Sequence, residues 1–179
     1  MRILVEDIPK EGIKLDFDLP PEWMRERIED PGDDFRFAEN IGVWVELYRT
    51  ERGIRVKGGY SSVAQLTCPK CLEEFTSPFE GEFDIRLMPD IYIAGKREVR
   101  LTRKDLDVEY FDGVVVDLEN IILSELMVNF PHDKLCRPDC KGLCPVCGAN
   151  WNYEKCEHYG AEHRYKNPIW DKIKLSIKL

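Results

Sequence analysis

The feature that most constrains this chain is a dense cluster of cysteines in its C-terminal third. Cys136, Cys140, Cys144 and Cys147 follow one another within a single short stretch. An apolar core does not require such a density of thiols, whereas a four-coordinate zinc ion does. Cys144 and Cys147 have the two-residue spacing of a zinc knuckle, and Gly148 permits the tight turn that aims backbone N–H groups at the thiolates. The spacing therefore predicts metal binding.

Two further pairs of residues extend the set of candidate ligands. Cys68 and Cys71 form a second knuckle-like pair far upstream, and Cys156 and His158 follow downstream. Thiolate and imidazole are the usual ligands of structural zinc, which takes four of them. Eight ligands suit two zinc ions, and a single ion is the alternative. The predicted metal ligands are Cys68, Cys71, Cys136, Cys140, Cys144, Cys147, Cys156 and His158.

The ligands can be paired in two ways. The preferred pairing gives one ion the four ligands of residues 144–158 and the other ion Cys68, Cys71, Cys136 and Cys140. The rival pairing joins the two knuckles around one ion and leaves the remaining cysteines as a weaker site or as free thiols. In both, metal cross-links segments more than sixty residues apart. An apparent binding energy on the order of 10 kcal/mol per zinc would match or exceed the net stability of an ordinary domain.

Charge and composition limit the classes of partner. The length of 179 residues allows one domain or a domain with a small appendage, and 43 % hydrophobic residues support a buried core. The formal net charge is −8, of which residues 1–46 carry −7, with thirteen acidic and six basic residues. A chain this acidic does not have the charge of a protein that binds nucleic acids non-specifically. Contact with RNA would need a local basic patch or another protein.

The sequence predicts a cytoplasmic protein with reduced thiols. Acidic residues stand where the apolar part of a signal peptide would run, and no apolar run reaches the roughly 20 residues that a transmembrane helix needs. A secreted disulfide framework is the alternative. The odd number of cysteines, seven, counts against it.

The fold class predicted for the chain is α+β, with a mainly antiparallel β-sheet or partial barrel, one central helix and a C-terminal zinc-binding module. Alternation of apolar and polar residues indicates the strands, and the Cys68 and Cys71 pair is expected at the turn of a hairpin between two of them. The segments with strand character are residues 2–5, 13–19, 41–48, 54–67, 79–87 and 108–111.

One helix is expected at residues 117–130, because Asp117 can cap its first turn and Pro131 ends it. A short charged helix is a candidate at residues 22–29, and an amphipathic helix in the tail. The predicted organisation is a β-rich domain over residues 1–131, a zinc-binding module over 132–164 joined to the Cys68 and Cys71 hairpin, and a tail over 165–179.

The cysteine pattern does not predict catalysis. The His-x-Glu of deaminases and the His-Glu-x-x-His of metalloproteases are absent, as are phosphate-binding and dinucleotide-binding motifs. A thioredoxin-like role would need a helix that starts at Cys68, and the strand that follows argues against it. His132 and His163 remain as spare ligands. We therefore expect no enzyme, no catalytic residue and no small-molecule substrate.

Three separated blocks, in order, resemble the YceD family of bacterial proteins. They are CPKCLEEF at residues 68–75, VDLENIILSEL at 116–126 and CRPDCKGLCPVCGANWN at 136–152. The family is named for its effect on the accumulation of large-subunit ribosomal RNA. The resemblance implies a zinc-binding factor in large-subunit (23S) ribosomal RNA processing and ribosome assembly, with an RNA precursor or an assembly protein as partner. His158 departs from the family pattern, which more often has cysteine there.

Two alternatives stay open. The first is an acidic adaptor whose N-terminal third docks a basic partner such as a ribosomal protein. The second is a zinc- or thiol-dependent enzyme. Basic stretches at residues 49–57 and 96–104 and the C-terminal lysines are compatible with phosphate contacts, although a solvated polar face is the favoured interpretation of the first stretch.

Overall fold

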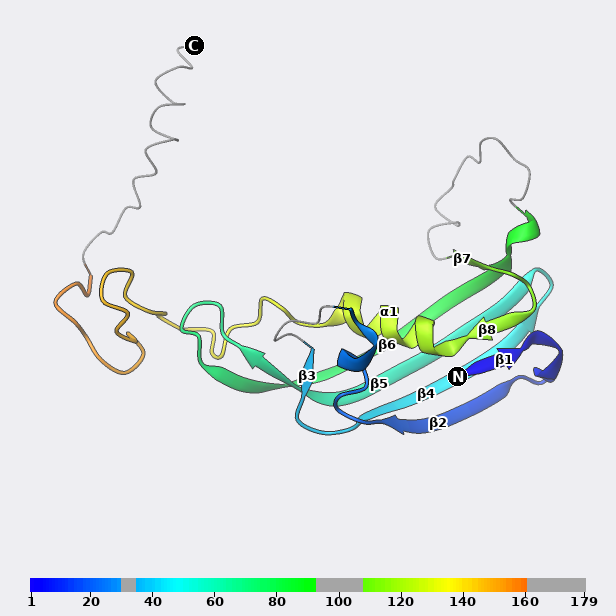
Figure 1. Ribbon diagram of the computed structural model, residues 1–179, viewed down its shortest axis with the longest axis horizontal. Helices are drawn as coiled ribbons and strands as arrows, with labels where there is room; N and C mark the ends of the chain where they lie inside the picture. The colour runs from blue at the N-terminus through cyan, green and yellow to red at the C-terminus, as the bar shows by residue number, and fades with distance from the viewer. Residues whose placement is uncertain (30–34, 93–107, 161–179) are drawn as a thin grey trace, which may run out of the picture. The chain divides into compact units, whose positions relative to one another are not determined.

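The protein is described by a computed structural model that covers residues 1–29, 35–92 and 108–160 (Figure 1). The described residues form two compact units. The first comprises Met1–Thr67 and Glu74–Lys134, and the second comprises Cys68–Glu73 and the described residues from Leu135 onward. The predicted tail helix, the basic stretch at 96–104 and His163 lie outside the described residues.

The first unit is built from two sheets and one α-helix. A six-stranded sheet has the order β2-β4-β5-β6-β7, with β3 also paired to β5, and β1 pairs with β8 in a second sheet. The strands are β1 (Arg2–Leu4), β2 (Ile13–Leu19), β3 (Arg36–Phe37), β4 (Ile41–Thr50), β5 (Gly53–Thr67), β6 (Glu74–Pro89), β7 (Val108–Phe111) and β8 (Val115–Asp117). The 3₁₀ turns are η1 (Val5–Asp7), η2 (Arg25–Arg27) and η3 (Asp90–Tyr92), and the helix is α1 (Leu118–Asn129).

The predicted antiparallel sheet is confirmed, with one parallel pair. All neighbouring strands run antiparallel except β6 and β7. In the part of the chain that the structure describes, the sheet ends at β2 and β7, which do not pair with each other, so it does not close into a barrel. Strand β1 pairs with β8 near the helix rather than with β2, which follows it in sequence.

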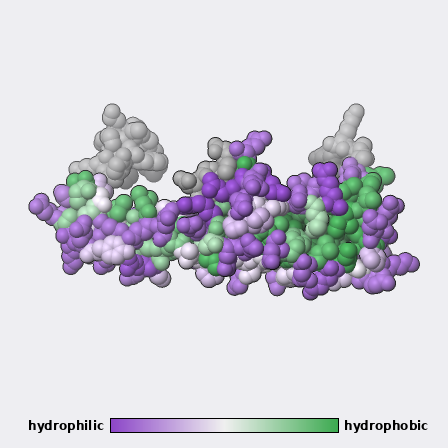
Figure 2. Space-filling model, turned by 60° about the horizontal axis from the view of Figure 1, so that its bottom comes forward, coloured by the Kyte–Doolittle hydropathy of each residue, from purple (hydrophilic) through white to green (hydrophobic). Residues whose placement is uncertain are grey.

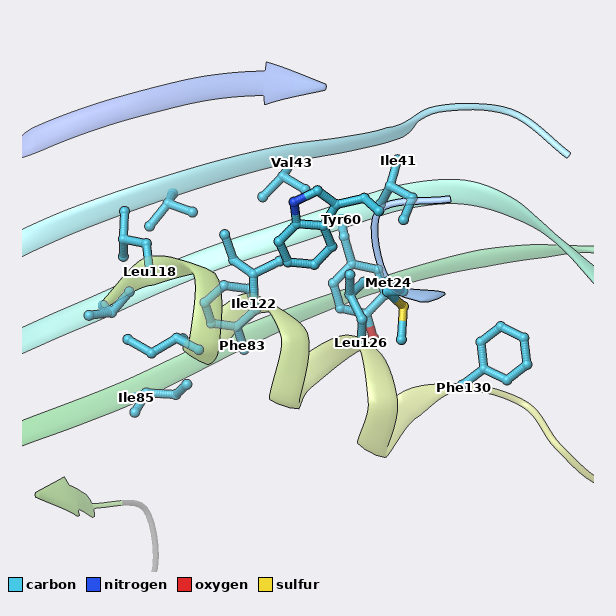
Figure 3. Close-up of a cluster of buried hydrophobic side chains, with 14 of the residues drawn as sticks. Met24, Ile41, Val43, Tyr60, Phe83, Ile85, Leu118, Ile122, Leu126 and Phe130 are labelled. Atoms are coloured by element: carbon cyan, nitrogen blue, oxygen red, sulfur yellow. The ribbon is translucent and has the colours of Figure 1, made fainter. Parts of the chain in front are cut away.

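The core lies between one face of the large sheet and α1 (Figure 3). Alternate residues of the strands point inward because side chains along a strand face opposite sides. The buried strand residues that face α1 include Val43, Val45, Leu47, Ile54, Val56, Tyr60, Phe83, Ile85 and Leu87. Helix α1 contributes the buried residues Leu118, Ile121, Ile122 and Leu126 to this core.

The ends of α1 confirm the predicted helix. The Asp117 side chain accepts a hydrogen bond from the backbone N–H of Asn120 at 3.4 Å, which caps the first turn. At the other end Phe130 leaves the helical conformation, directly before Pro131.

The helix predicted at residues 22–29 is wrong. Only η2 forms there, and Ile28 is already extended. Trp23 and Met24, which precede η2, are buried in the core. A segment this short gains little from helical hydrogen bonds, so the burial of these two side chains decides its conformation.

Strands β5 and β6 form the longest hairpin of the chain. Their pairing runs from Ile54 opposite Leu87 to Thr67 opposite Glu74. The loop that joins them is Cys68–Glu73, which belongs to the second unit. The hairpin turn predicted for Cys68 and Cys71 is therefore confirmed.

The basic hairpin of β4 and β5 has partners within the protein. Arg55 donates two hydrogen bonds to the Asp84 carboxylate, at 2.7 and 2.6 Å, and Arg49 donates to the carbonyl of Val5. The Asp84 carboxylate compensates the positive charge of Arg55, so the hairpin offers less positive charge to a phosphate than its sequence indicates. No helix among the described residues has the length and apolar character needed to cross a membrane.

We expect Leu126→Ala to lower the free energy of unfolding of the full-length protein by about 2–5 kcal/mol, because it leaves a cavity between α1 and the sheet. Val128→Ala is the matched control on the same helix, since Val128 is 83 % exposed. Its effect should stay within about 0.5 kcal/mol. Urea denaturation followed by far-UV circular dichroism measures both. Equal losses would contradict the assigned core.

Candidate metal centre

The eight predicted ligands lie in the second unit, in two groups of four. Within each group, the sulfur and imidazole nitrogen atoms that could hold a metal all lie within 4.8 Å of one another. The first group is Cys68, Cys71, Cys136 and Cys140. The second group is Cys144, Cys147, Cys156 and His158. Of the two pairings open from the sequence, the structure brings the residues together in the preferred one.

The spacing of the sulfur atoms fits a tetrahedral ion. The Sγ atoms of Cys68 and Cys140 lie 3.8 Å apart, and those of Cys71 and Cys136 lie 3.5 Å apart. Zinc–sulfur bonds of about 2.3 Å in a tetrahedron place two sulfurs about 3.8 Å from each other. All seven cysteines are free thiols. The donor sets, four sulfurs in one group and three sulfurs with one imidazole in the other, are those of closed zinc sites.

The loop between β5 and β6 shapes half of the first group. The backbone N–H of Cys68 donates to the carbonyl of Glu73 at 2.9 Å, and that of Leu72 donates to the carbonyl of Cys68 at 2.8 Å. Leu72 adopts the left-handed conformation, with φ of 59°. This tight turn brings Cys68 and Cys71 to the same side of the loop, where both are buried.

A glycine lets the chain approach this loop closely. The backbone N–H of Leu143 donates to the carbonyl of Lys70 at 3.0 Å. Gly142 has φ of +77°, and a Cβ atom there would lie only 3.0 Å from the same carbonyl oxygen. A larger residue would therefore be strained and crowded at this position. Gly142 thus permits the contact between the loop of the first group and the start of the second.

The second group begins with a knuckle turn. The backbone N–H of Gly148 donates to the carbonyl of Cys144 at 2.9 Å, and the N–H of Val146 points at the Cys144 sulfur at 3.4 Å. Gly148 has φ of +75°, which a glycine adopts without strain. The turn predicted from Cys144, Cys147 and Gly148, with backbone N–H directed at a thiolate, is present. Cys144 is buried and Cys147 is exposed.

Two side chains donate hydrogen bonds to sulfur atoms of the groups. The Trp151 indole N–H lies 3.3 Å from the Cys156 sulfur, and the Asn152 amide lies 3.5 Å from the Cys140 sulfur. Asn152 is held in place because its Oδ1 atom accepts the backbone N–H of Lys141 at 2.9 Å. Such outer contacts orient ligands and stabilise their charge. The contact of Asn152 was not predicted from the sequence, because an asparagine beside a turn has many structural uses.

The surroundings of the thiols lower the pKa of some cysteines and raise that of others. Burial opposes ionisation of Cys144, but the backbone N–H groups of Cys147 and Val146 outweigh it and lower the pKa of Cys144 to about 7. Cys68 is similar: burial is outweighed by backbone N–H groups, and its pKa is lowered. Burial and the neighbouring thiols Cys68, Cys136 and Cys140 raise the pKa of Cys71. A divalent cation between the sulfurs would allow all of them to ionise together.

The spare histidine that the structure describes lies elsewhere. His132 is in the first unit, with its ring 5.3 Å from that of Phe35 and 5.2 Å from that of Phe130. It therefore belongs to neither ligand group.

Residues 56–175 match the family described as "Large ribosomal RNA subunit accumulation protein YceD". The chain belongs to the YceD family. The match includes the β5–β6 hairpin, α1 and both ligand groups, so the resemblance noted in three sequence blocks is confirmed.

The chain is also similar to several curated proteins. An uncharacterized protein of Mycobacterium leprae is 33% identical over 133 residues, which cover 74% of this chain and 57% of the relative. An uncharacterized protein of Mycobacterium tuberculosis is 28% identical over 121 residues, with 68% and 54% covered. The "Large ribosomal RNA subunit accumulation protein YCED homolog 1, chloroplastic" of Arabidopsis thaliana is 22% identical over 152 residues, with 73% and 47% covered. The chain thus spans about half the length of these relatives. No solved structure matches it.

Native mass spectrometry of the zinc-loaded protein should count two ions per chain, one for each group. Cys68→Ser/Cys71→Ser should retain one ion, because the second group does not use these thiols. Cys144→Ser/Cys147→Ser should also retain one, held by the first group. The rival pairing, in which the two knuckles share an ion, predicts that either double variant loses its tightly bound zinc. That result would refute the grouping seen here.

Proposed function

We propose that the chain is a non-enzymatic zinc-binding factor that supports the accumulation of large-subunit ribosomal RNA in the cytoplasm. The observation that carries this proposal is the family match over residues 56–175, which covers both ligand groups. The printed name of the Arabidopsis relative refers to the same RNA. The proposed partner is a ribosomal RNA precursor or a ribosome-assembly protein.

The donor sets support a structural role for the metal. Each group offers four sulfur or nitrogen ligands, which fill the coordination of zinc and leave no position for a substrate or an activated water. We therefore assign two zinc ions to the two groups, with no catalytic residue. Binding of each ion would contribute about 10–16 kcal/mol to the folding of the second unit.

The proposed zinc ions divide the chain into segments with different sources of stability. In this proposal residues 1–131 form a β-rich domain, residues 132–164 together with the Cys68 and Cys71 hairpin form the zinc-binding module, and residues 165–179 form a tail. The described second unit holds few apolar residues in its interior apart from its cysteines. Metal coordination would therefore replace the hydrophobic core that such a small module lacks.

Aromatic and cationic side chains on the second unit support a direct contact with RNA. The Arg137 guanidinium lies 5.6 Å from the ring centre of Tyr153, and the Lys155 ammonium lies 5.0 Å from that of Tyr159. Tyr153 is 71% exposed. Exposed rings beside positive charges can stack on unpaired bases while the cations contact phosphates.

A complementation experiment tests the proposal. In a bacterium that lacks its own YceD protein, the wild-type chain should restore the ratio of large-subunit to small-subunit ribosomal RNA. Cys68→Ser/Cys71→Ser, expressed at the same level, should fail because the first zinc site is lost. Lys70→Gln keeps both cysteines of the same loop and should restore the ratio. Full restoration by the double cysteine variant would overturn the role of the metal.

A further inference from the structure

The face of the large sheet opposite α1 carries an uneven distribution of charge. It is formed by the outward residues of β2, β4, β5 and β6, which lie side by side in Figure 1. Figure 2 shows hydrophilic and apolar side chains together at the surface of the protein. One row across these strands aligns Lys14, Glu46, Lys57 and Asp84. In this row the Lys14 ammonium lies 3.6 Å from the Glu46 carboxylate, and the Asp84 carboxylate accepts two hydrogen bonds from Arg55. The acidic groups of this row therefore have cationic partners.

The next two rows lack such compensation. The first aligns Asp16, Trp44, Gly59 and Glu82, and the second aligns Asp18, Gly42, Ser61 and Glu80. The four carboxylates are exposed. No cation of the described residues pairs with any of the four, although the neighbouring row shows that this face accommodates ion pairs. The result is a local concentration of negative charge around one tryptophan.

A hollow of about 460 Å³ opens among these residues. Its outward side chains are those of Asp16, Asp18, Trp44 and Ser61, and Gly42 adds none. Trp44 is held beside the hollow because its indole lies directly on Gly59, where a Cβ atom would come within 2.5 Å of the indole nitrogen. The hollow, which Phe17, Val43 and Tyr60 also line, thus combines an aromatic wall and two carboxylates with the small residues Gly42 and Ser61.

We propose that this hollow is the docking site for a basic segment of a partner protein, with a lysine or arginine side chain seated between Trp44 and the carboxylates of Asp16 and Asp18. An aromatic face and carboxylates together favour a cation, and Arg or Lys over Trp is the strongest pair of this kind. The Lys14 ammonium lies 5.7 Å from the Trp44 ring centre, so this ring already attracts one cation of the protein itself.

The arrangement of the acids indicates how the segment lies. Asp18 on β2 and Glu80 on β6 are in the same row, three strand spacings apart, or about 14 Å. An extended peptide spans about 13 Å between residues four apart. A segment with basic residues at this interval could therefore contact both groups of acids as it crosses the strands.

The negative charge of this face favours a basic segment over RNA and over a second copy of the chain. The phosphates of RNA would be repelled by the four carboxylates, and so would the same face of a second copy of the chain. The inference goes beyond the proposed function, since it requires neither zinc nor RNA and concerns the first unit alone.

Fluorescence anisotropy with a labelled nona-arginine peptide tests the site in the full-length protein at physiological salt. Asp16→Asn/Asp18→Asn should weaken binding about 10-fold, because it removes the two carboxylates that would contact the seated cation. Ser61→Lys places a competing cation in the hollow and should weaken binding at least as much. Asp7→Asn/Glu11→Gln removes the same charge from exposed residues outside the hollow. It should change the dissociation constant less than two-fold.

Three outcomes would overturn the proposal. The first is an equal effect of both double variants, which would mean that only net charge attracts the peptide. The second is that the wild-type protein binds a labelled single-stranded RNA directly and that Ser61→Lys strengthens this binding, which would make the face an RNA surface. The third is a dimer in sedimentation experiments that Ser61→Lys disrupts, which would assign the hollow to a second copy. Far-UV circular dichroism of each variant establishes that the sheet is intact.

Discussion

The arrangement of the second unit depends on sulfur atoms that lie close to one another without bonding. Four thiols from two distant parts of the chain meet within 4.8 Å, and a second group of three thiols and an imidazole repeats the arrangement. Thiolates at this distance repel each other, and burial together with the neighbouring thiols raises the pKa of Cys71. A divalent cation removes both costs. Zinc at these two positions, as proposed, would explain why so many cysteines gather in a unit with so little apolar core.

The first unit supplies the covalent framework that presents these ligands. Strands β5 and β6 pair from Ile54 opposite Leu87 up to Thr67 opposite Glu74, directly beside the loop, so the loop holds Cys68 and Cys71 in a tight turn. Helix α1 ends at a defined residue before Pro131, and the segment that follows carries Cys136 and Cys140. A hydrophobic core thus organises one unit, while hydrogen bonds from Trp151, Asn152 and backbone N–H groups to sulfur organise the other. The family match extends across both.

Local patterns made much of this predictable from sequence. The alternation in β2 predicted its bounds, and Asp117 and Pro131 marked the ends of α1, because these signals act within a few residues. The grouping of Cys68 with Cys136 was one of two possibilities that the spacing allowed. Long-range packing was not predictable: β1 pairs with β8, and the burial of Trp23 and Met24 prevents a helix. The hollow beside Trp44 was missed because it depends on the register of four strands, which brings Gly42 and Ser61 together.

Zinc K-edge X-ray absorption of the metal-loaded, full-length protein tests the central claim most directly, because it reports the atoms bound to the metal. Seven sulfurs and one imidazole shared by two ions give an average of 3.5 sulfur and 0.5 nitrogen neighbours per zinc. The account predicts this average, with zinc–sulfur distances of about 2.3 Å. An average of two or more oxygen or nitrogen neighbours per zinc would contradict it, because the metal would then not be closed by the thiols that the fold brings together.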